Sequence, residues 1–127
     1  MCGIIGFIGP KKDQKTVNDE VSIQYQRQQD RGTKGYGIIT VDKNNKATIH
    51  RSLIENAALL DLLRFPSKMV FMHHRNPTSS DNRIDQTHPI IVDNEALTHK
   101  YFVIHNGVIS NSDKIIETHE KEGFIYT

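Results

Sequence analysis

Short apolar runs alternate with helical stretches along the chain, and several of these runs are joined by turns of only a few residues. The runs with strand character are residues 2–8, 36–42, 47–50, 68–74, 89–92 and 101–105. Asn44-Asn45 is a turn signal between two of them, so we expect a hairpin there. Strands joined by short turns pair antiparallel, and helices then cover the sheet. The pattern predicts an α/β domain with a mixed or antiparallel sheet.

Three segments have the apolar spacing of an α-helix. Each is preceded by a pair of residues that resembles a capping box. These pairs are Thr16 with Asp19, Ser52 with Glu55, and Ser110 with Asp113. The helices are expected to end before Arg31, at Pro66 and at Gly123. Residues 124–126 have the character of the first half of another strand.

Length and composition restrict the class of protein. With 127 residues the chain is expected to form a single domain, residues 1–127. A charged fraction of 24% and a hydrophobic fraction of 36% suit a folded domain rather than a disordered chain. A net charge of +1 gives no strong attraction to nucleic acid or to a membrane surface. No apolar run can span a bilayer and no signal peptide is visible, so we expect a cytoplasmic protein.

Cys2 is the single cysteine of the chain, which excludes an intramolecular disulfide. Removal of Met1 would leave a free α-amine on the residue that carries the thiol. Such an amine, with a pKa of about 7.7–8.0, can accept the thiol proton near neutral pH. On position alone, a nucleophilic Cys2 and an incidental thiol near a chain end are about equally supported.

The run Cys-Gly-Ile-Ile-Gly-Phe-Ile-Gly at residues 2–9 resembles the start of the class II, or N-terminal-nucleophile, glutamine amidotransferases. This family includes the glutaminase domains of glucosamine-6-phosphate synthase, asparagine synthetase, glutamate synthase and amidophosphoribosyltransferase. The resemblance implies that the mature N-terminal Cys2 attacks the side-chain amide of glutamine. It also implies a four-layer αββα sandwich of the N-terminal-nucleophile hydrolase type.

Two later segments resemble family motifs that contact the substrate. Residues 31–38, Arg-Gly-Thr-Lys-Gly-Tyr-Gly-Ile, resemble a loop in which Arg31 would help shape the floor of the site. Lys34 departs from the acidic residue of some members. Residues 73–79, His-His-Arg-Asn-Pro-Thr-Ser, resemble a motif in which Arg75 would hold the α-carboxylate of glutamine and Thr78 would contact the same end. Taken alone, these segments also fit a glycine-rich turn and a polar surface loop.

A third segment, residues 102–111, resembles the family motif His-Asn-Gly-x-(Ile/Leu)-x-Asn. The resemblance implies that the Asn106 side-chain NH₂ and the Gly107 backbone N–H stabilise the oxyanion formed during attack. Asn-Gly alone equally indicates a hairpin turn. His105 and the segment Thr87-His88-Pro89 are interpreted as structural.

Neither a metal nor an organic cofactor is implied. The pair His73-His74 invites a metal interpretation, but neighbouring residues on a strand point to opposite faces of the sheet. They therefore make a poor pair of ligands.

The resemblance covers the N-terminal portion of a glutaminase domain, incomplete at the C-terminus. In the family an Asp that binds the α-amine of glutamine follows; here it would lie beyond Thr127. The chain is thus either a fragment of a longer amidotransferase or a protein completed by a partner.

The implied function is hydrolysis of L-glutamine to glutamate and ammonia through a γ-glutamyl thioester on Cys2. The ammonia would pass to a synthase domain or subunit that acts as the acceptor partner. Two alternatives remain: a non-catalytic binding or regulatory module with the same fold, and another Cys-type N-terminal-nucleophile amide hydrolase.

Overall fold

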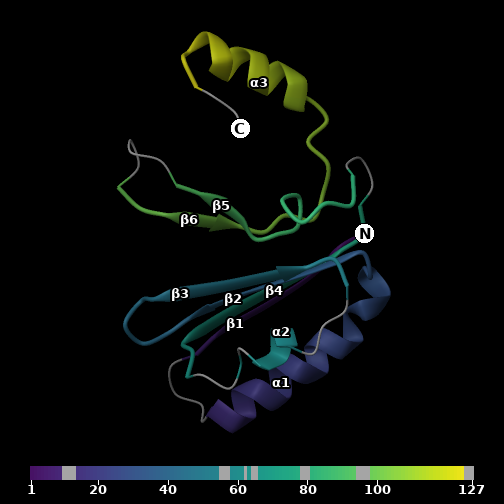
Figure 1. Ribbon diagram of the computed structural model, residues 1–127, viewed down its shortest axis with the longest axis vertical. Helices are drawn as coiled ribbons and strands as arrows, with labels where there is room; N and C mark the ends of the chain where they lie inside the picture. Colours follow the sequence, from purple (N-terminus) through teal and green to yellow (C-terminus); the bar gives the residue numbers. More distant parts are fainter. Residues whose placement is uncertain are drawn as a thin grey trace.

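The computed structural model describes residues 1–9, 14–54, 58–61, 63, 66–77, 81–93 and 98–124. In chain order its elements are β1 (Gly3–Ile8), α1 (Gln14–Arg27), the 3₁₀ helix η1 (Gln29–Arg31), β2 (Gly35–Val41), β3 (Ala47–Ser52), α2 (Ala58–Asp61), β4 (Met69–Arg75), β5 (Ile90–Val92), β6 (Tyr101–Val103) and α3 (Ser112–Lys121). Strands and helices alternate as the sequence pattern predicts (Figure 1).

The larger sheet contains four strands in the order β1-β4-β2-β3, and every neighbouring pair is antiparallel. Gly3 at the start of β1 pairs with His74, and Gly35 at the start of β2 pairs with Arg75. The starts of β1 and β2 therefore meet the end of β4 at one end of the sheet. The N-terminus lies at this end (Figure 1).

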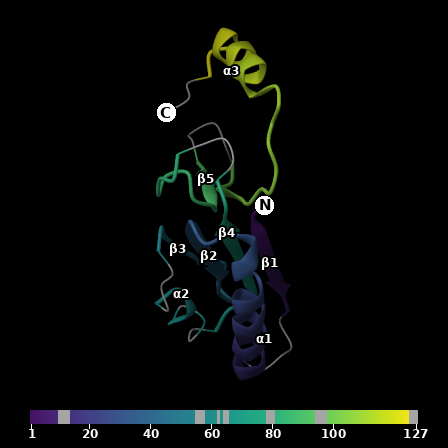
Figure 2. The same cartoon turned by 90° about the vertical axis from the view of Figure 1, so that its right-hand side faces the viewer.

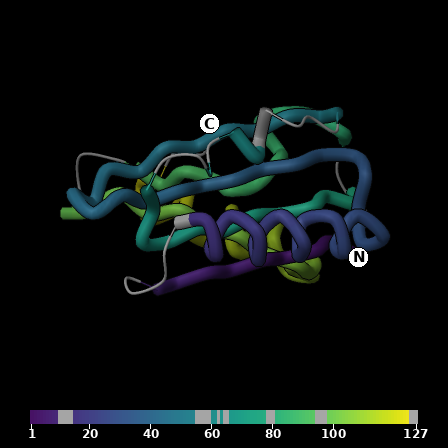
Figure 3. Tube along the Cα trace, turned by 90° about the horizontal axis from the view of Figure 1, so that it is seen from below, coloured from purple at the N-terminus to yellow at the C-terminus, as the bar shows by residue number. Residues whose placement is uncertain are grey.

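The elements are stacked in four layers. Helices α1 and α2 cover one face of the four-stranded sheet, and the antiparallel β5–β6 pair lies over the other face (Figure 1). Helix α3 lies beyond β5–β6, on the side away from the large sheet, and the view turned by 90° shows the same order (Figures 1 and 2). Seen from below, α1 runs lengthwise along the sheet (Figure 3). The predicted αββα arrangement is confirmed for the described part of the chain.

The main core lies between α1 and the sheet. Val17, Val21 and Tyr25 recur at intervals of four residues, so they fall on one face of α1. They pack against buried side chains of the sheet and of residue 63, namely Ile5, Tyr36, Ile38, Leu63, Val70 and Met72. Removing one such side chain from water contributes about 1.5–3 kcal/mol. This layer holds the sheet, and with it the end of β4, in place.

A cavity borders the opposite face of the sheet. Apolar side chains of both sheets line this cavity of about 410 Å³, among them Ile39, Phe71 and Phe102. These residues belong to β2, β4 and β6, so the cavity separates the two sheets over part of their contact.

The predicted N-cap residues Thr16, Ser52 and Ser110 are not the N-caps of helices, although α1 and α3 begin within a few residues of the predicted starts. Thr16 lies inside α1, which already includes Gln14, and an ion pair joins Lys15 to Asp19 one turn later. Ser52 is the last residue of β3, and its hydroxyl bonds to the backbone of Ile54, so it forms a local turn instead of a helix cap.

Asn111, not Ser110, is the N-cap of α3, and it makes no side-chain capping bond. The last helix ends as predicted, with Gly123 at a φ of +89°. The hairpin turn is also confirmed, since the Asp42 Oδ1 accepts the N–H groups of Asn44 and Lys46. Glu55 and the expected strand at residues 125–126 lie outside the described residues.

Candidate active site

Three segments that are distant in the sequence meet at Cys2. The Cys2 backbone N–H donates to Asn106 Oδ1 at 3.2 Å. The Asn76 backbone N–H donates to Cys2 Sγ at 3.4 Å, and the Asn76 carbonyl oxygen lies 3.7 Å from Sγ. Asn76 directly follows β4, and Asn106 follows β6 after two further residues. The large sheet and the smaller sheet thus each contribute a residue beside the thiol.

The contact with Asn106 involves the atom that becomes the α-amine nitrogen after removal of Met1. Because Oδ1 accepts the hydrogen bond from this nitrogen, the Nδ2 group of Asn106 is left to donate to another group. Gly107 follows directly, and a Cβ placed there would come within 2.8 Å of the His105 ring. The Asn106-Gly107 segment therefore bends closely around His105, with both residues exposed.

Arg75 is only 4% exposed at the end of β4. Its guanidinium donates to the carbonyl oxygens of Asp81 at 2.7 Å and Arg83 at 3.0 Å. The Thr87 hydroxyl, itself buried, also donates to the Arg83 carbonyl at 3.1 Å. These contacts fix the polar loop that follows Asn76 onto the end of the sheet.

Of the two remaining predicted substrate contacts, Arg31 and Thr78, the structure describes only Arg31. Arg31 is exposed in η1, and its Cβ lies 3.1 Å from the position of a Cβ built on Gly3, beside the start of β1. Thr78 lies outside the described residues. The structure thus brings Cys2 and Asn106 into contact, with Arg75 next to Asn76 in the chain and Arg31 beside β1.

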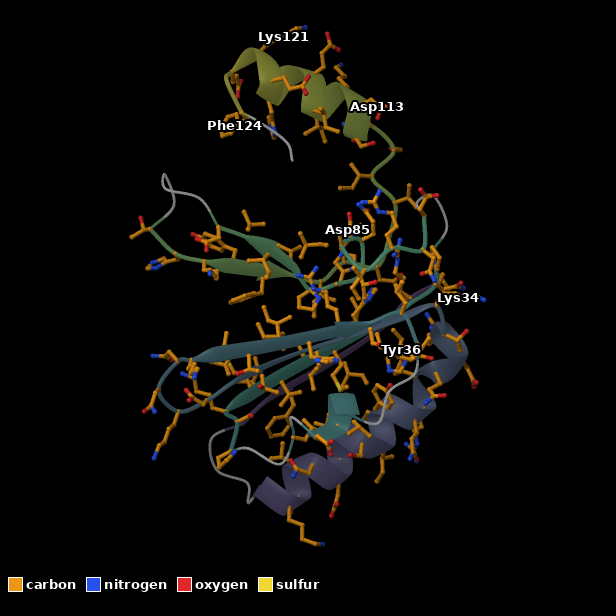
Figure 4. The ribbon with its side chains drawn as sticks, viewed as in Figure 1. Lys34, Tyr36, Asp85, Asp113, Lys121 and Phe124 are labelled. Carbon is orange, nitrogen blue, oxygen red and sulfur yellow. The ribbon has the colours of Figure 1, made fainter. Side chains whose placement is uncertain are left out.

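The histidines at the end of β4 face opposite sides of the sheet, as the strand alternation predicts. The His73 ring packs edge-on against His88 at 4.5 Å, toward β5–β6. The His74 ring packs against Tyr25 and Tyr36 on the helix side, at 4.6 and 5.2 Å. Figure 4 shows Tyr36 on this helix side and Asp85 on the opposite side of the sheet. Among residues that the structure describes, no three His, Cys, Asp or Glu side chains form a group that could hold a metal ion.

Burial keeps the histidines between the sheets neutral. The pKa of His73 is lowered from 6.5 to about 4, chiefly by loss of contact with water and then by the charge of His88. The pKa of His88 is also lowered, again first by burial and then by the charges of His105 and Arg75. An uncharged contact therefore joins β4 to the segment before β5, next to the Cys2 site.

The glycine-rich segment at residues 32–37 allows the segment before β5 to pack closely on β2, a role that the sequence did not indicate. A Cβ at Gly37 would lie 1.7 Å from the His88 carbonyl oxygen, so glycine lets residues 87–89 lie directly on β2. The interpretation of Thr87-His88-Pro89 as a structural segment agrees with this packing.

Asn76 is the residue of the site that the sequence did not indicate. Its contact with Cys2 is made by backbone atoms, which no side-chain pattern reveals. Its position directly after Arg75, at the end of a strand, was the available signal.

No family model matches the chain, but individual relatives do. It is 26% identical over 121 residues to an amidophosphoribosyltransferase of Pasteurella multocida (strain Pm70), covering 92% of this chain and 22% of that protein. It is 30% identical over 129 residues to a glutamine–fructose-6-phosphate aminotransferase (isomerizing) of Pyrococcus horikoshii, covering 99% of this chain and 20% of that protein. The chain thus spans about a fifth of the length of these relatives.

Solved structures show the same fold. An allosteric regulatory enzyme of purine biosynthesis superposes with a TM-score of 0.74 at 19% identity, over all of this chain and 26% of the other. The glutamine phosphoribosylpyrophosphate amidotransferase of B. subtilis superposes with a TM-score of 0.69, over the same shares of each chain. The sequence relatives and the structural neighbours together support a glutamine amidotransferase domain of the N-terminal-nucleophile type.

Proposed function

We propose that this domain hydrolyses L-glutamine to glutamate and ammonia through a γ-glutamyl thioester on Cys2. The observation that carries the proposal is the contact between the Cys2 nitrogen and Asn106 Oδ1, across 104 positions of sequence. It joins the predicted nucleophile to the predicted oxyanion donor. The names of the relatives, an amidophosphoribosyltransferase and a glutamine–fructose-6-phosphate aminotransferase, support the same chemistry.

In the proposed reaction, the α-amine exposed by removal of Met1 takes the proton of the Cys2 thiol. The sulfur then attacks the side-chain amide carbon of glutamine, and the oxyanion accepts hydrogen bonds from Asn106 Nδ2 and the Gly107 N–H. The ammonium returns its proton to the departing nitrogen, which leaves as ammonia. Water attacks the thioester, loses a proton to the same amine and releases glutamate with the thiol restored.

Arg75, Thr78 and Arg31 are the proposed contacts for the remainder of glutamine. Arg75 is a suitable carboxylate ligand because its guanidinium is charged and fixed in position. A bound carboxylate would compete with the carbonyl oxygens of Asp81 and Arg83 that Arg75 now contacts. We therefore expect residues 81–83 to shift when glutamine binds.

The released ammonia needs an acceptor. The relatives named above are much longer than this chain, so we propose that the ammonia passes to a synthase domain or subunit. None of the helices described is long and apolar enough to cross a membrane. A cytoplasmic location remains a prediction.

A glutaminase assay with Cys2→Ala tests the proposal. The unchanged protein should release glutamate and ammonia, while Cys2→Ala should lose activity by at least about 10³-fold, as expected for removal of a nucleophile. His99→Gln is the control, since His99 is exposed and outside the site. A chloroketone analogue of glutamine should label Cys2, and glutamine should prevent the labelling. Equal activity of the protein and Cys2→Ala would reject the mechanism.

A further inference from the structure

We propose that the backbone N–H of Asn76 is a catalytic donor that stabilises the thiolate of Cys2. The proposal rests on the proposed function, because it assigns a role during activation of the nucleophile. It adds a group that does not depend on the identity of the side chain at position 76.

Two backbone groups of Asn76 lie beside the sulfur. The Asn76 nitrogen lies 3.4 Å from Sγ, a distance at which an N–H donates to sulfur. The carbonyl oxygen of the same residue is farther away, at 3.7 Å, where it can accept the S–H of the neutral thiol. After the thiol loses its proton, the nearer group is the donor. Hydrogen bonds to an ionised group are stronger than those to a neutral one, so this donor favours the thiolate.

The peptide that carries this N–H is held from several sides. The carbonyl oxygen of Arg75, the other half of the peptide, accepts the Lys34 N–H at 3.0 Å. A trans peptide directs its N–H opposite to its C=O, so this bond orients the Asn76 N–H toward the sulfur. The Arg75 side chain is in turn anchored to Asp81 and Arg83.

Gly32 packs directly against the same peptide. A Cβ at Gly32 would lie 2.5 Å from the carbonyl carbon and oxygen of Arg75 and 2.9 Å from the Asn76 nitrogen. These distances are shorter than van der Waals contact, so only glycine at position 32 lets the η1–β2 loop lie this close to the peptide. A fixed donor needs little reorganisation when charge develops on the sulfur.

Proline at position 76 removes the N–H, while alanine removes only the side chain. The matched variants are therefore Asn76→Pro and Asn76→Ala. Because β4 ends at Arg75, no strand pairing of the large sheet uses the N–H at position 76. The Cδ of a proline would lie close to Sγ, and steric hindrance of this kind would slow alkylation at every pH. Arg75 also already has the extended backbone that the residue before a proline requires.

The assay is alkylation of Cys2 by iodoacetamide between pH 6 and pH 9.5. Cys2 is the single cysteine, so the rate reports this thiol alone. At pH 7 we expect Asn76→Ala to react at the wild-type rate and Asn76→Pro to react about three- to tenfold more slowly. At pH 9.5 the proline variant should react as fast as the alanine variant or faster, since a more basic thiolate is a stronger nucleophile. An unfolded chain would also return Cys2 to the behaviour of a free thiol, so the comparison is made on variants shown to be folded.

Circular dichroism and the thermal unfolding midpoint establish that the variants are folded. If Asn76→Pro does not fold, Gly32→Ala displaces the same peptide from the opposite side and should show the same slowing at low pH. Equal rates at pH 7 for a folded proline variant and Asn76→Ala, or an unchanged rate in Gly32→Ala after a failed proline variant, overturn the proposal. Alkylation requires no glutamine turnover, so this outcome is separate from the Cys2→Ala test of the glutaminase function.

Discussion

Acidification should weaken this fold through His73, a side chain of which only 1% is exposed. The folded protein holds the His73 pKa near 4, below its ordinary value of 6.5. Between these two values the unfolded chain binds a proton that the folded chain does not. The stabilisation is therefore complete above about pH 6.5 and is lost as the pH falls toward 4.

The difference between the His73 pKa of 6.5 in the unfolded chain and about 4 in the folded chain limits the contribution of His73 to the free energy of unfolding to about 3 kcal/mol. Between pH 7 and pH 5, the linkage relation gives a loss of about 2 kcal/mol in the free energy of unfolding. The groups that set the shift surround His73 on β4 and on the segments packed against it. They are His74 and Arg75 on its own strand, with His88 and the backbone of His105 opposite.

The assay is urea unfolding of the wild-type chain and of His73→Phe at pH 7 and pH 5. Phenylalanine keeps a ring against His88 but cannot bind a proton. We expect His73→Phe to lose about 2 kcal/mol less than the wild type over this interval. The control His99→Gln changes an exposed histidine and should follow the wild type.

The comparison between variants isolates His73 from the carboxylates and other histidines that also titrate over this interval. If His73→Phe and the wild type lose the same stability between pH 7 and pH 5, the buried histidine does not oppose protonation. The account of the contact between β4 and His88 as a neutral one would then be wrong.

Three further substitutions test the packing. Gly37→Ala should cost about 3 kcal/mol or more in urea unfolding, because its Cβ would overlap the His88 carbonyl oxygen; a cost below about 1 kcal/mol would contradict this contact. Met72→Ala should cost about 2–5 kcal/mol, since Met72 is fully buried under α1, whereas a change at the core boundary such as Leu60→Ala should cost less. Asp42→Ala should lower the thermal midpoint by an amount equivalent to about 1–2 kcal/mol, because two backbone N–H groups of the hairpin turn lose their acceptor; an unchanged midpoint would show that water replaces it.

The local sequence determined most of the secondary structure. Apolar runs bounded by glycine, proline and asparagine set the strands, and Val17, Val21 and Tyr25 set the buried face of α1, because these signals depend on spacing of 2 or 3.6 residues alone. Helix starts were less predictable. Thr16 and Ser52 both have the side chains of a cap, but their hydroxyls occupy a helix interior and a strand end. A capping signal acts locally, and contacts with the rest of the fold can override it.

The residue types at Cys2, Arg75 and Asn106 were also apparent from the sequence, because a nucleophile, a cation and an amide are recognisable as side chains. Only the tertiary structure decided which atoms meet. Antiparallel pairing brings the end of β4 to the start of β1, and β6 places Asn106 beside the Cys2 nitrogen. The donor at Asn76 could not be predicted, because a backbone N–H is common to every residue except proline and gains its role from position alone.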